Sequence, residues 1–205
     1  MTVLLVCVAG QVLFGTAALV LGSWLRANPT PANAEWSSRI MHLLFFVLQN
    51  FLPLVIVFWP GIFQLDAITG VMPLTPRWLS LVGGVLLAVP GLYLLTVTNR
   101  ALRALGNGAN AFRLTSTVVQ ERIYASTRNP MSLGFYLWLT AVGLLTGSTT
   151  FTLLVLVAIV PAHIVFLRAF EEDELALRLG ASYLEYRQRT PFLLPHFRTS
   201  SPQRT

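Results

Sequence analysis

The sequence has few charges and no lysine. Only 11% of its 205 residues are charged, less than half the share that is usual in soluble domains. A soluble protein with so few charges could not cover its surface with polar groups, so a soluble globular domain is excluded. All 14 basic residues are arginine. With 55% hydrophobic residues, the composition indicates a protein whose solvent is a lipid bilayer.

Cysteine and clustered metal ligands are also scarce. Cys7 is the single cysteine and lies in an apolar run, which excludes disulfide frameworks and multi-cysteine metal sites. Neither His42 nor His163 has a second ligand at metal-binding spacing, so no metal is expected. His163 is interpreted as a hydrogen-bonded packing residue. The net charge of +6 does not predict a nucleic-acid partner, because the arginines flank apolar runs as topology signals do.

Long apolar runs predict the fold class, which is an all-α polytopic membrane bundle with about five transmembrane helices. A run of about 20 residues crosses a hydrocarbon core of about 30 Å. The expected spans are Val3–Leu25, Ile40–Phe63 with a break at Pro53, Trp78–Thr98, the shorter Met131–Thr146, and Thr149–Leu167.

The connections after the fourth and fifth runs predict a hairpin and a cytoplasmic helix. Gly147-Ser148 leaves almost no room between the last two spans, which favours a tight antiparallel hairpin. Apolar residues at helical spacing predict a further helix over Leu167–Gln188, interrupted at Gly180. We expect three parts: an N-terminal part at 1–98, a core at 99–197 and a disordered tail at 198–205.

The arginines predict the orientation of the spans. In the five-span arrangement all arginines except Arg77 fall on one side. Because cytoplasmic loops carry the excess of basic residues, we expect the N-terminus outside and the C-terminus inside. The expected location is the bacterial cytoplasmic membrane, with the chemistry at its cytoplasmic face.

Two of four clusters that could carry chemistry precede or open the fourth span. Gly106 and Gly108 could let the backbone approach a ligand closely, or they form an ordinary loop. In Arg128-Asn129-Pro130, asparagine suits a helix N-cap and proline the first helical position. The helix start and the Arg128 charge would together attract a carboxylate or phosphate. The alternative is a topology arginine on a capped helix.

The other two clusters follow the fifth span. Four of the eight carboxylates lie in Glu171–Glu174. One of them could bind a ribose; the alternative is a solvated helix face with ion pairs Arg168–Glu172 and Glu174–Arg178. The stretch Tyr183–Pro191 holds two tyrosines and two arginines. It could bind an acidic substrate head, or form the interfacial belt common in membrane proteins.

The ordered combination of these clusters resembles the isoprenylcysteine carboxyl methyltransferase and phospholipid methyltransferase superfamily. The resemblance covers about residues 95–197. The chain departs from the family pattern at Ala109, Arg122-Ile123, Ala125-Ser126 and Ser132, which leaves the methyl acceptor open. The matching motifs are Gly106-x-Gly108, Tyr124, Arg128-Asn129-Pro130-Met131-Ser132-Leu133-Gly134, Glu171-Glu172-x-x-Leu175, Leu179-Gly180-x-x-Tyr183-x-x-Tyr186, Pro191 and Leu194-Pro195.

The resemblance implies methyl transfer from S-adenosyl-L-methionine to a lipophilic acceptor that enters from the bilayer. That acceptor could be a carboxylate, a thiol, a hydroxyl or a lipid amine; the alternative is a catalytically degenerate frame that is structural or binds a partner. Arg187 and Arg189 are the residues assigned to the acceptor as catalytic groups, and Tyr183 and Tyr186 to substrate binding. The residues assigned to the cofactor are Gly106, Gly108, Tyr124, Arg128, Asn129, Pro130, Leu133, Gly134, Glu171 and Glu172.

Overall fold

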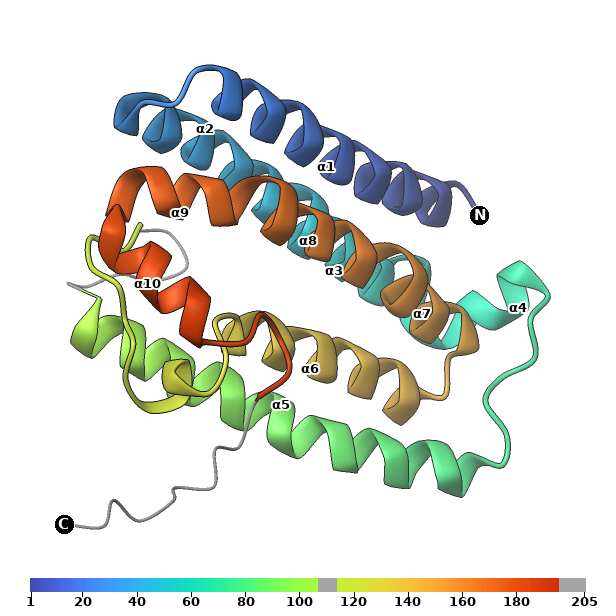
Figure 1. Ribbon diagram of the computed structural model, residues 1–205. Helices are drawn as coiled ribbons and strands as arrows, with labels where there is room; N and C mark the ends of the chain where they lie inside the picture. The colour runs from blue at the N-terminus through green and yellow to red at the C-terminus, as the bar shows by residue number, and fades with distance from the viewer. Residues whose placement is uncertain (107–113, 196–205) are drawn as a thin grey trace, which may run out of the picture.

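The computed structural model describes residues 1–106 and 114–195, and the regular elements within these ranges are all helical (Figure 1). This confirms the predicted all-α fold class. The elements are α1 (Thr2–Ala27), α2 (Pro31–Leu44), η1 (Phe45–Phe51), α3 (Leu52–Ile56), η2 (Val57–Gly61), η3 (Ile62–Gln64), α4 (Leu65–Thr69), α5 (Arg77–Leu105), η4 (Arg122–Ala125), α6 (Pro130–Thr146), α7 (Thr149–Leu154), η5 (Val155–Ile159), α8 (Val160–Phe166), η6 (Leu167–Glu171), α9 (Glu172–Leu179) and α10 (Ala181–Arg189).

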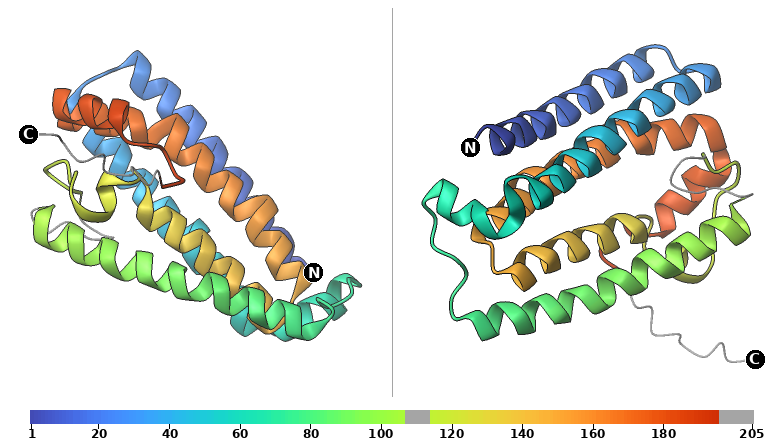
Figure 2. Two further views of the ribbon diagram at one scale, coloured as in Figure 1. Left: turned by 60° about the horizontal axis from the view of Figure 1, so that its bottom comes forward. Right: turned by 180° about the vertical axis from the view of Figure 1, so that it is seen from behind.

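The long helices run roughly side by side, and successive ones alternate in direction (Figures 1 and 2). Four helices of the described chain are long and apolar enough to cross a membrane: Thr2–Ala27, Pro31–Thr69, Arg77–Leu105 and Thr149–Leu179. The remaining predicted span, α6, has 17 residues and is shorter than these. It begins at Pro130, and α5 packs along it.

The second span is continuous at Pro53, so the predicted break at this proline is wrong. The preceding segment η1 is a π-helical turn, and the N–H of Leu52 bonds to the carbonyl of Val47. Gln11 of α1 donates to the Leu48 carbonyl at 2.7 Å, which satisfies an acceptor beside the proline. The helix breaks instead at Trp59, whose φ of −143° and ψ of 116° are non-helical. Trp59 precedes Pro60, and the residue before a proline is disfavoured in the α conformation.

The predicted hairpin between α6 and α7 is confirmed. Gly147 adopts a φ of 76°, which a glycine allows without strain, and Ser148 caps α7 by accepting from the N–H of Phe151. Asp66, at the end of the second span, forms further hydrogen bonds to the hairpin that the sequence did not predict. Its carboxylate accepts from the N–H groups of Thr149 at 3.0 Å and Thr150 at 2.7 Å. The carboxylate thus joins the second span to the start of α7.

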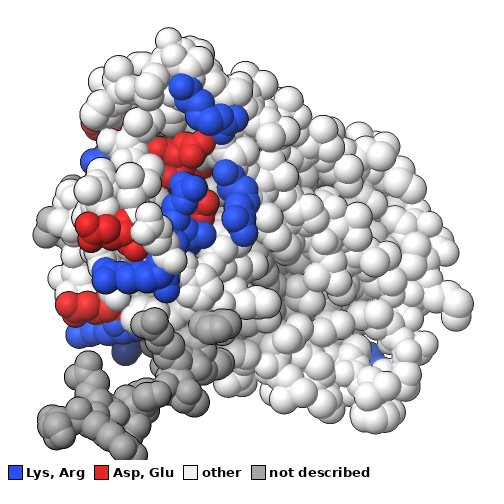
Figure 3. Space-filling model, in the orientation of Figure 1, with Lys and Arg blue, Asp and Glu red and all other residues white. Residues whose placement is uncertain are grey.

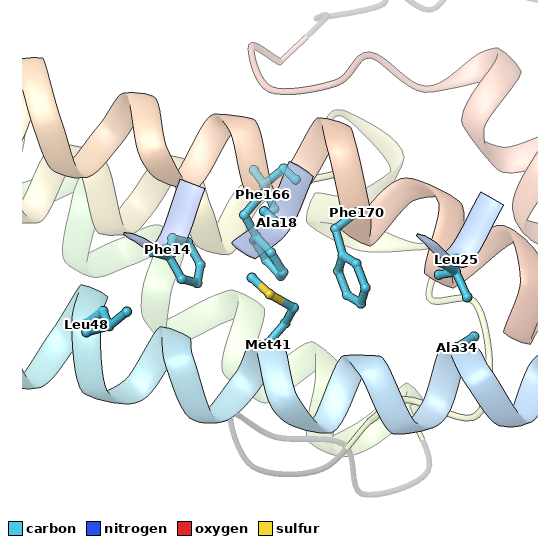
Figure 4. Packing of buried hydrophobic residues seen from close by; sticks show 9 residues of the cluster. Phe14, Ala18, Leu25, Ala34, Met41, Leu48, Phe166 and Phe170 are labelled. Carbon is cyan, nitrogen blue, oxygen red and sulfur yellow. The ribbon is translucent and has the colours of Figure 1, made fainter. Parts of the chain in front are cut away.

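A hydrophobic core joins the first, second and fifth spans (Figure 4). Phe14 and Ala18 of α1 meet Met41 of α2 and Phe166 of α8, and all four are nearly or fully buried. Large side chains on the outer faces of α1 and α5 stay exposed, as expected for surfaces that meet lipid.

Gly22 brings α1 into direct contact with the fifth span. A Cβ atom on Gly22 would lie 1.8 Å from the carbonyl oxygen of Ala169 in the π-helical turn η6. We therefore expect Gly22→Ala to lower the free energy of unfolding by about 1–3 kcal/mol through overpacking. Thermal unfolding in detergent measures this. Gly15→Ala is the matched control on the same helix, because its Cβ would meet its nearest atom at 3.9 Å. Equal stability of the two variants would contradict the prediction.

Charged side chains gather at one end of the bundle, where α9 and α10 lie (Figure 3). Arg77, predicted to lie on the opposite side, begins α5 at the other end. Its guanidinium donates to the carbonyls of Leu144 and Leu145 at the end of α6. The last carbonyls of a helix lack regular intrahelical partners, and here Leu144 also accepts from the N–H of Gly147, so Arg77 has a local structural role at the end of α6.

Candidate active site

A cavity of about 380 Å³ lies toward the charged end of the bundle. One part of its wall, called the mouth below, carries the polar side chains of the acidic cluster and of α10; the other part, called the deep end, carries the aromatic side chains Phe45, Phe135, His163 and Phe166. Its wall is made by the end of α2, η1, α5, the segment 114–124, the start of α6, and the helices from α8 to α10. The volume is within the range of small-molecule sites.

Arg128 and Glu172 form a buried ion pair beside the mouth. The Nη2 atom of Arg128 lies 2.7 Å from Oε1 of Glu172, and the two side chains are only 9% and 10% exposed. Arg128 also donates from Nη1 to the carbonyl of Arg187 at 3.1 Å. The prediction assigned Arg128 and Glu172 to separate parts of the cofactor. The structure pairs them with each other, and of the two only Arg128 lines the cavity.

The segment after α10 fixes the start of α6. The Arg128 N–H donates to the Pro191 carbonyl at 2.9 Å, and Asn129 Nδ2 donates to the Phe192 carbonyl at 2.8 Å. Thr127 Oγ1 donates to the carbonyl of Leu193 at 2.8 Å. Asn129 occupies the N-cap position, but its side chain makes no capping bond, contrary to expectation. Its amide is used to bind the C-terminal segment instead.

Glu171 is the member of the acidic pair that faces the cavity. It ends the π-helical turn η6, and it lines the wall, whereas Glu172 does not. No hydrogen bond or ion pair holds its carboxylate among the described residues. A carboxylate with unused acceptor capacity in a cavity wall can accept from the hydroxyl groups of a ligand.

Glu174 and Arg178 form the second ion pair of the wall. Arg178 Nε donates to Glu174 Oε1 at 2.6 Å, which is the predicted pair. The guanidinium also donates to the carbonyl of Thr115 and so ties α9 to the segment 114–121. Glu172 and Glu174 are 8% and 2% exposed, so the interpretation of this cluster as a solvated helix face is wrong. The predicted pair Arg168–Glu172 is not formed, because Arg168 stacks on the Phe192 ring at 3.6 Å.

Three tyrosines complete the mouth: Tyr124, Tyr183 and Tyr186. Burial raises the pKa of Tyr183 well above its usual range, and the carboxylates of Glu171 and Glu172 raise it further. Burial also raises the pKa of Tyr186, whose hydroxyl donates to the Tyr124 carbonyl at 2.8 Å. Both phenols therefore stay protonated at neutral pH, as hydrogen-bond donors. Tyr183 and Tyr186 are buried, which contradicts the interfacial-belt interpretation for this pair.

Asn129 and Pro130 also line the cavity, whereas the predicted residues Leu133, Gly134, Arg187 and Arg189 lie outside its wall. Gly134 contacts α5, where a Cβ would come within 3.0 Å of the Gly91 carbonyl, and Leu133 is its neighbour on α6. Arg187 is 41% exposed and lies 4.0 Å from Glu172. Arg189 binds Gln120 in a separate hollow.

One of the two predicted glycines before the fourth span lies within the described residues and the other lies outside them. Gly106 caps the end of α5, donating to the Leu102 carbonyl at 2.9 Å. Gly108 lies outside the described residues, and so does the predicted tail at 198–205.

Sequence reasoning missed three residues that shape the mouth: Thr127, Arg178 and Phe192. Arg178 was seen as one half of a surface pair, without its bond to Thr115. Thr127 and Phe192 gave no signal of their own, because their contacts join segments more than 60 residues apart. The one sequence signal for this segment was the pair of prolines, Pro191 and Pro195, which end the preceding helix and restrict the backbone after it.

Comparison with known proteins places the chain in a family. The phospholipid methyltransferase family model matches residues 79–181, half of the chain. The chain therefore belongs to this family of integral membrane methyltransferases, which confirms the predicted resemblance. It is 28% identical over 180 residues to methanethiol S-methyltransferase 2 of Bradyrhizobium diazoefficiens. The matched region is 80% of this chain and spans 65% of that relative. No solved structure matches.

Proposed function

We propose that the chain transfers a methyl group from S-adenosyl-L-methionine to a lipophilic acceptor, and that both bind in the cavity of about 380 Å³. The observation that carries the proposal is that the cavity wall has a polar part and an aromatic part. Its mouth holds Glu171, whose carboxylate has no partner among the described residues, with protonated tyrosines, whereas its deep end is lined by aromatic rings. The family match and the methyltransferase relative support the same reaction class.

The mouth fits a nucleoside with an amino-acid tail. Glu171 has acceptor capacity for a ribose hydroxyl pair. The N–H groups of Met131 and Ser132, in the first turn of α6, have no hydrogen-bond acceptor among the described residues, and both residues line the cavity. With the positive end of the helix dipole and Arg128 beside them, these N–H groups would bind the carboxylate of the tail. When bound, the cofactor supplies a methyl group already activated on a sulfonium, so the protein mainly holds donor and acceptor in line.

The ion pairs of the wall favour a neutral acceptor over a carboxylate. Among the described residues, Arg128 and Arg178 are the arginines that line the cavity, and each is already paired with a glutamate. Arg187 and Arg189 lie outside the wall, so the proposal gives them no part in the chemistry. We therefore propose a thiol as the acceptor; the name of the methanethiol relative agrees with this choice.

Two measurements on the purified full chain test the proposed function. We expect S-adenosylhomocysteine to bind in a calorimetric titration, and labelled methyl from S-adenosyl-L-methionine to appear on an alkanethiol. A catalytically degenerate frame predicts neither result. Binding without transfer to a thiol, but with transfer to a membrane lipid extract, would move the acceptor to another class and leave the reaction type unchanged.

The orientation in the membrane follows from the charged end. We propose that this end is cytoplasmic, because it holds most arginines, and that the N-terminus is external. Reporters fused after Gly70 are expected to be external, and those fused after Gly106 or Pro195 to be cytoplasmic. A cytoplasmic signal from the fusion after Gly70 would contradict this topology. The control is the full-length chain with the reporter fused to its C-terminus.

A further inference from the structure

His163 lies at the deep end of the cavity, inside a ring of aromatic side chains. It belongs to α8, and its ring centroid lies 5.0 Å from that of Phe45, 5.6 Å from that of Phe166 and 6.0 Å from that of Phe135. The Tyr136 ring stands edge-on to it at 5.5 Å. Three of these neighbours, Phe45, Phe135 and Phe166, line the cavity together with His163. The deep end therefore offers polarisable aromatic surface around the His163 imidazole.

The imidazole of His163 has no hydrogen-bond partner within the described part of the chain. Its Nδ1 atom is buried and unsatisfied, and the residue is 5% exposed. The prediction that His163 is a hydrogen-bonded packing residue is therefore wrong. An unsatisfied buried polar group costs about 1–3 kcal/mol, and an ionisable residue at membrane depth is a functional candidate by default. If this position served packing alone, a phenylalanine would be more stable there than a histidine, because the neighbouring side chains are largely phenylalanines.

We infer that His163 binds the reacting S–H group of the thiol acceptor and takes its proton. This inference rests on the proposed function and names the residue that would recognise the acceptor. A neutral imidazole can accept a hydrogen bond from a thiol, and thiol sulfur makes favourable contacts with aromatic rings. The alkyl chain of the acceptor would lie along the phenylalanines.

The transfer step balances with His163 as the proton acceptor. The acceptor sulfur forms a bond to the methyl carbon of the sulfonium donor. The bond between that carbon and the donor sulfur breaks, and its electron pair stays on the donor sulfur, which becomes a neutral sulfide. The thiol proton moves to the imidazole of His163 and leaves later to solvent. The products are a methyl thioether and S-adenosylhomocysteine.

Kinetics with octanethiol as the probe test the inference. We expect His163→Phe to bind S-adenosylhomocysteine as the wild type does, while kcat/KM for octanethiol falls at least about tenfold, as expected for loss of a hydrogen bond and a proton acceptor. His163→Gln, which keeps a hydrogen-bond acceptor, should recover part of the KM but not kcat. Wild-type turnover of octanethiol by His163→Phe would overturn the inference.

A variant of a neighbouring buried residue tests whether the effect comes from the imidazole itself or from disturbed packing. Phe14 of α1 lies 6.5 Å from His163 between ring centroids, is fully buried and does not line the cavity. Phe14→Leu should lower stability and leave octanethiol turnover unchanged. If Phe14→Leu lowers turnover as strongly as His163→Phe does, packing accounts for the effect and the inference fails.

A binding measurement on the unaltered chain keeps the inference falsifiable if His163→Phe does not fold. The chain has three histidines, so labelling them with ¹⁵N gives a simple spectrum. Adding octanethiol with S-adenosylhomocysteine should shift the ring nitrogens of His163, whose signals are told apart from those of His42, which also lines the cavity, by comparison with a His42→Gln variant. If the protein turns over octanethiol and the His163 signals do not respond, the inference is overturned and the proposed function stands. If the wild type neither binds S-adenosylhomocysteine nor transfers methyl, both fall.

Discussion

Replacing Arg128 with alanine is expected to lower the free energy of unfolding by about 3 kcal/mol, because the buried Glu172 carboxylate loses its close partner and keeps only Arg187 at 4.0 Å. The pair is 9% and 10% exposed, and its atoms lie 2.7 Å apart. The bond from Arg128 to the Arg187 carbonyl is lost as well. Thermal unfolding in detergent gives the change in stability, and titration with S-adenosylhomocysteine gives the accompanying loss of affinity.

Two further variants separate charge from geometry at Arg128. Arg128→Lys keeps the charge but not the planar fork that reaches Glu172 and the Arg187 carbonyl together, so we expect an intermediate loss of stability and affinity. Arg128→Met combined with Glu172→Gln removes both charges. It should recover much of the stability without recovering cofactor affinity. Wild-type stability and affinity in Arg128→Ala would mean that Arg128 is one topology charge among many, and would remove the structural basis of the proposed cofactor site.

Replacing Glu171 with glutamine is expected to weaken S-adenosylhomocysteine binding about 10–100-fold, as for the loss of about 1.5–3 kcal/mol of charge-assisted hydrogen bonding. Glu171 lines the cavity, and no side chain of the described residues pairs with it. Calorimetry on the purified variant measures the change. Stability should change little, since no ion pair is broken.

Asp173→Asn is the matched control for Glu171, because it removes a charge two residues away in the same acidic cluster. Asp173 pairs with Arg26 of α1 at 2.8 Å and is not part of the cavity wall. The affinity of Asp173→Asn for S-adenosylhomocysteine should equal that of the wild type. If the two variants lose affinity equally, the general negative charge of the cluster matters and Glu171 has no specific role.

The sequence by itself determined the membrane class, the helical fold and the family. Long charge-free runs need a bilayer, and a run that crosses a bilayer must satisfy its own backbone hydrogen bonds as a helix. The Gly147-Ser148 connection determined the hairpin, because two residues leave no other path. Gly180 was correctly expected to interrupt the last helix, and its φ of 67° shows why a glycine stands there. The order of short motifs along 95–197 was enough for the family, which the family model confirms.

The tertiary structure alone decided which side chains meet in the cavity. The π-helical turn Leu167–Glu171 shifts the helical phase just before the acidic cluster, so a regular periodicity could not tell that Glu171 faces the cavity and Glu172 faces Arg128. The same limit applies to His163, whose aromatic neighbours Phe45 and Phe135 come from other helices. Contacts of this kind depend on how distant helices pack against one another, and a single sequence records the residues but not their facing partners.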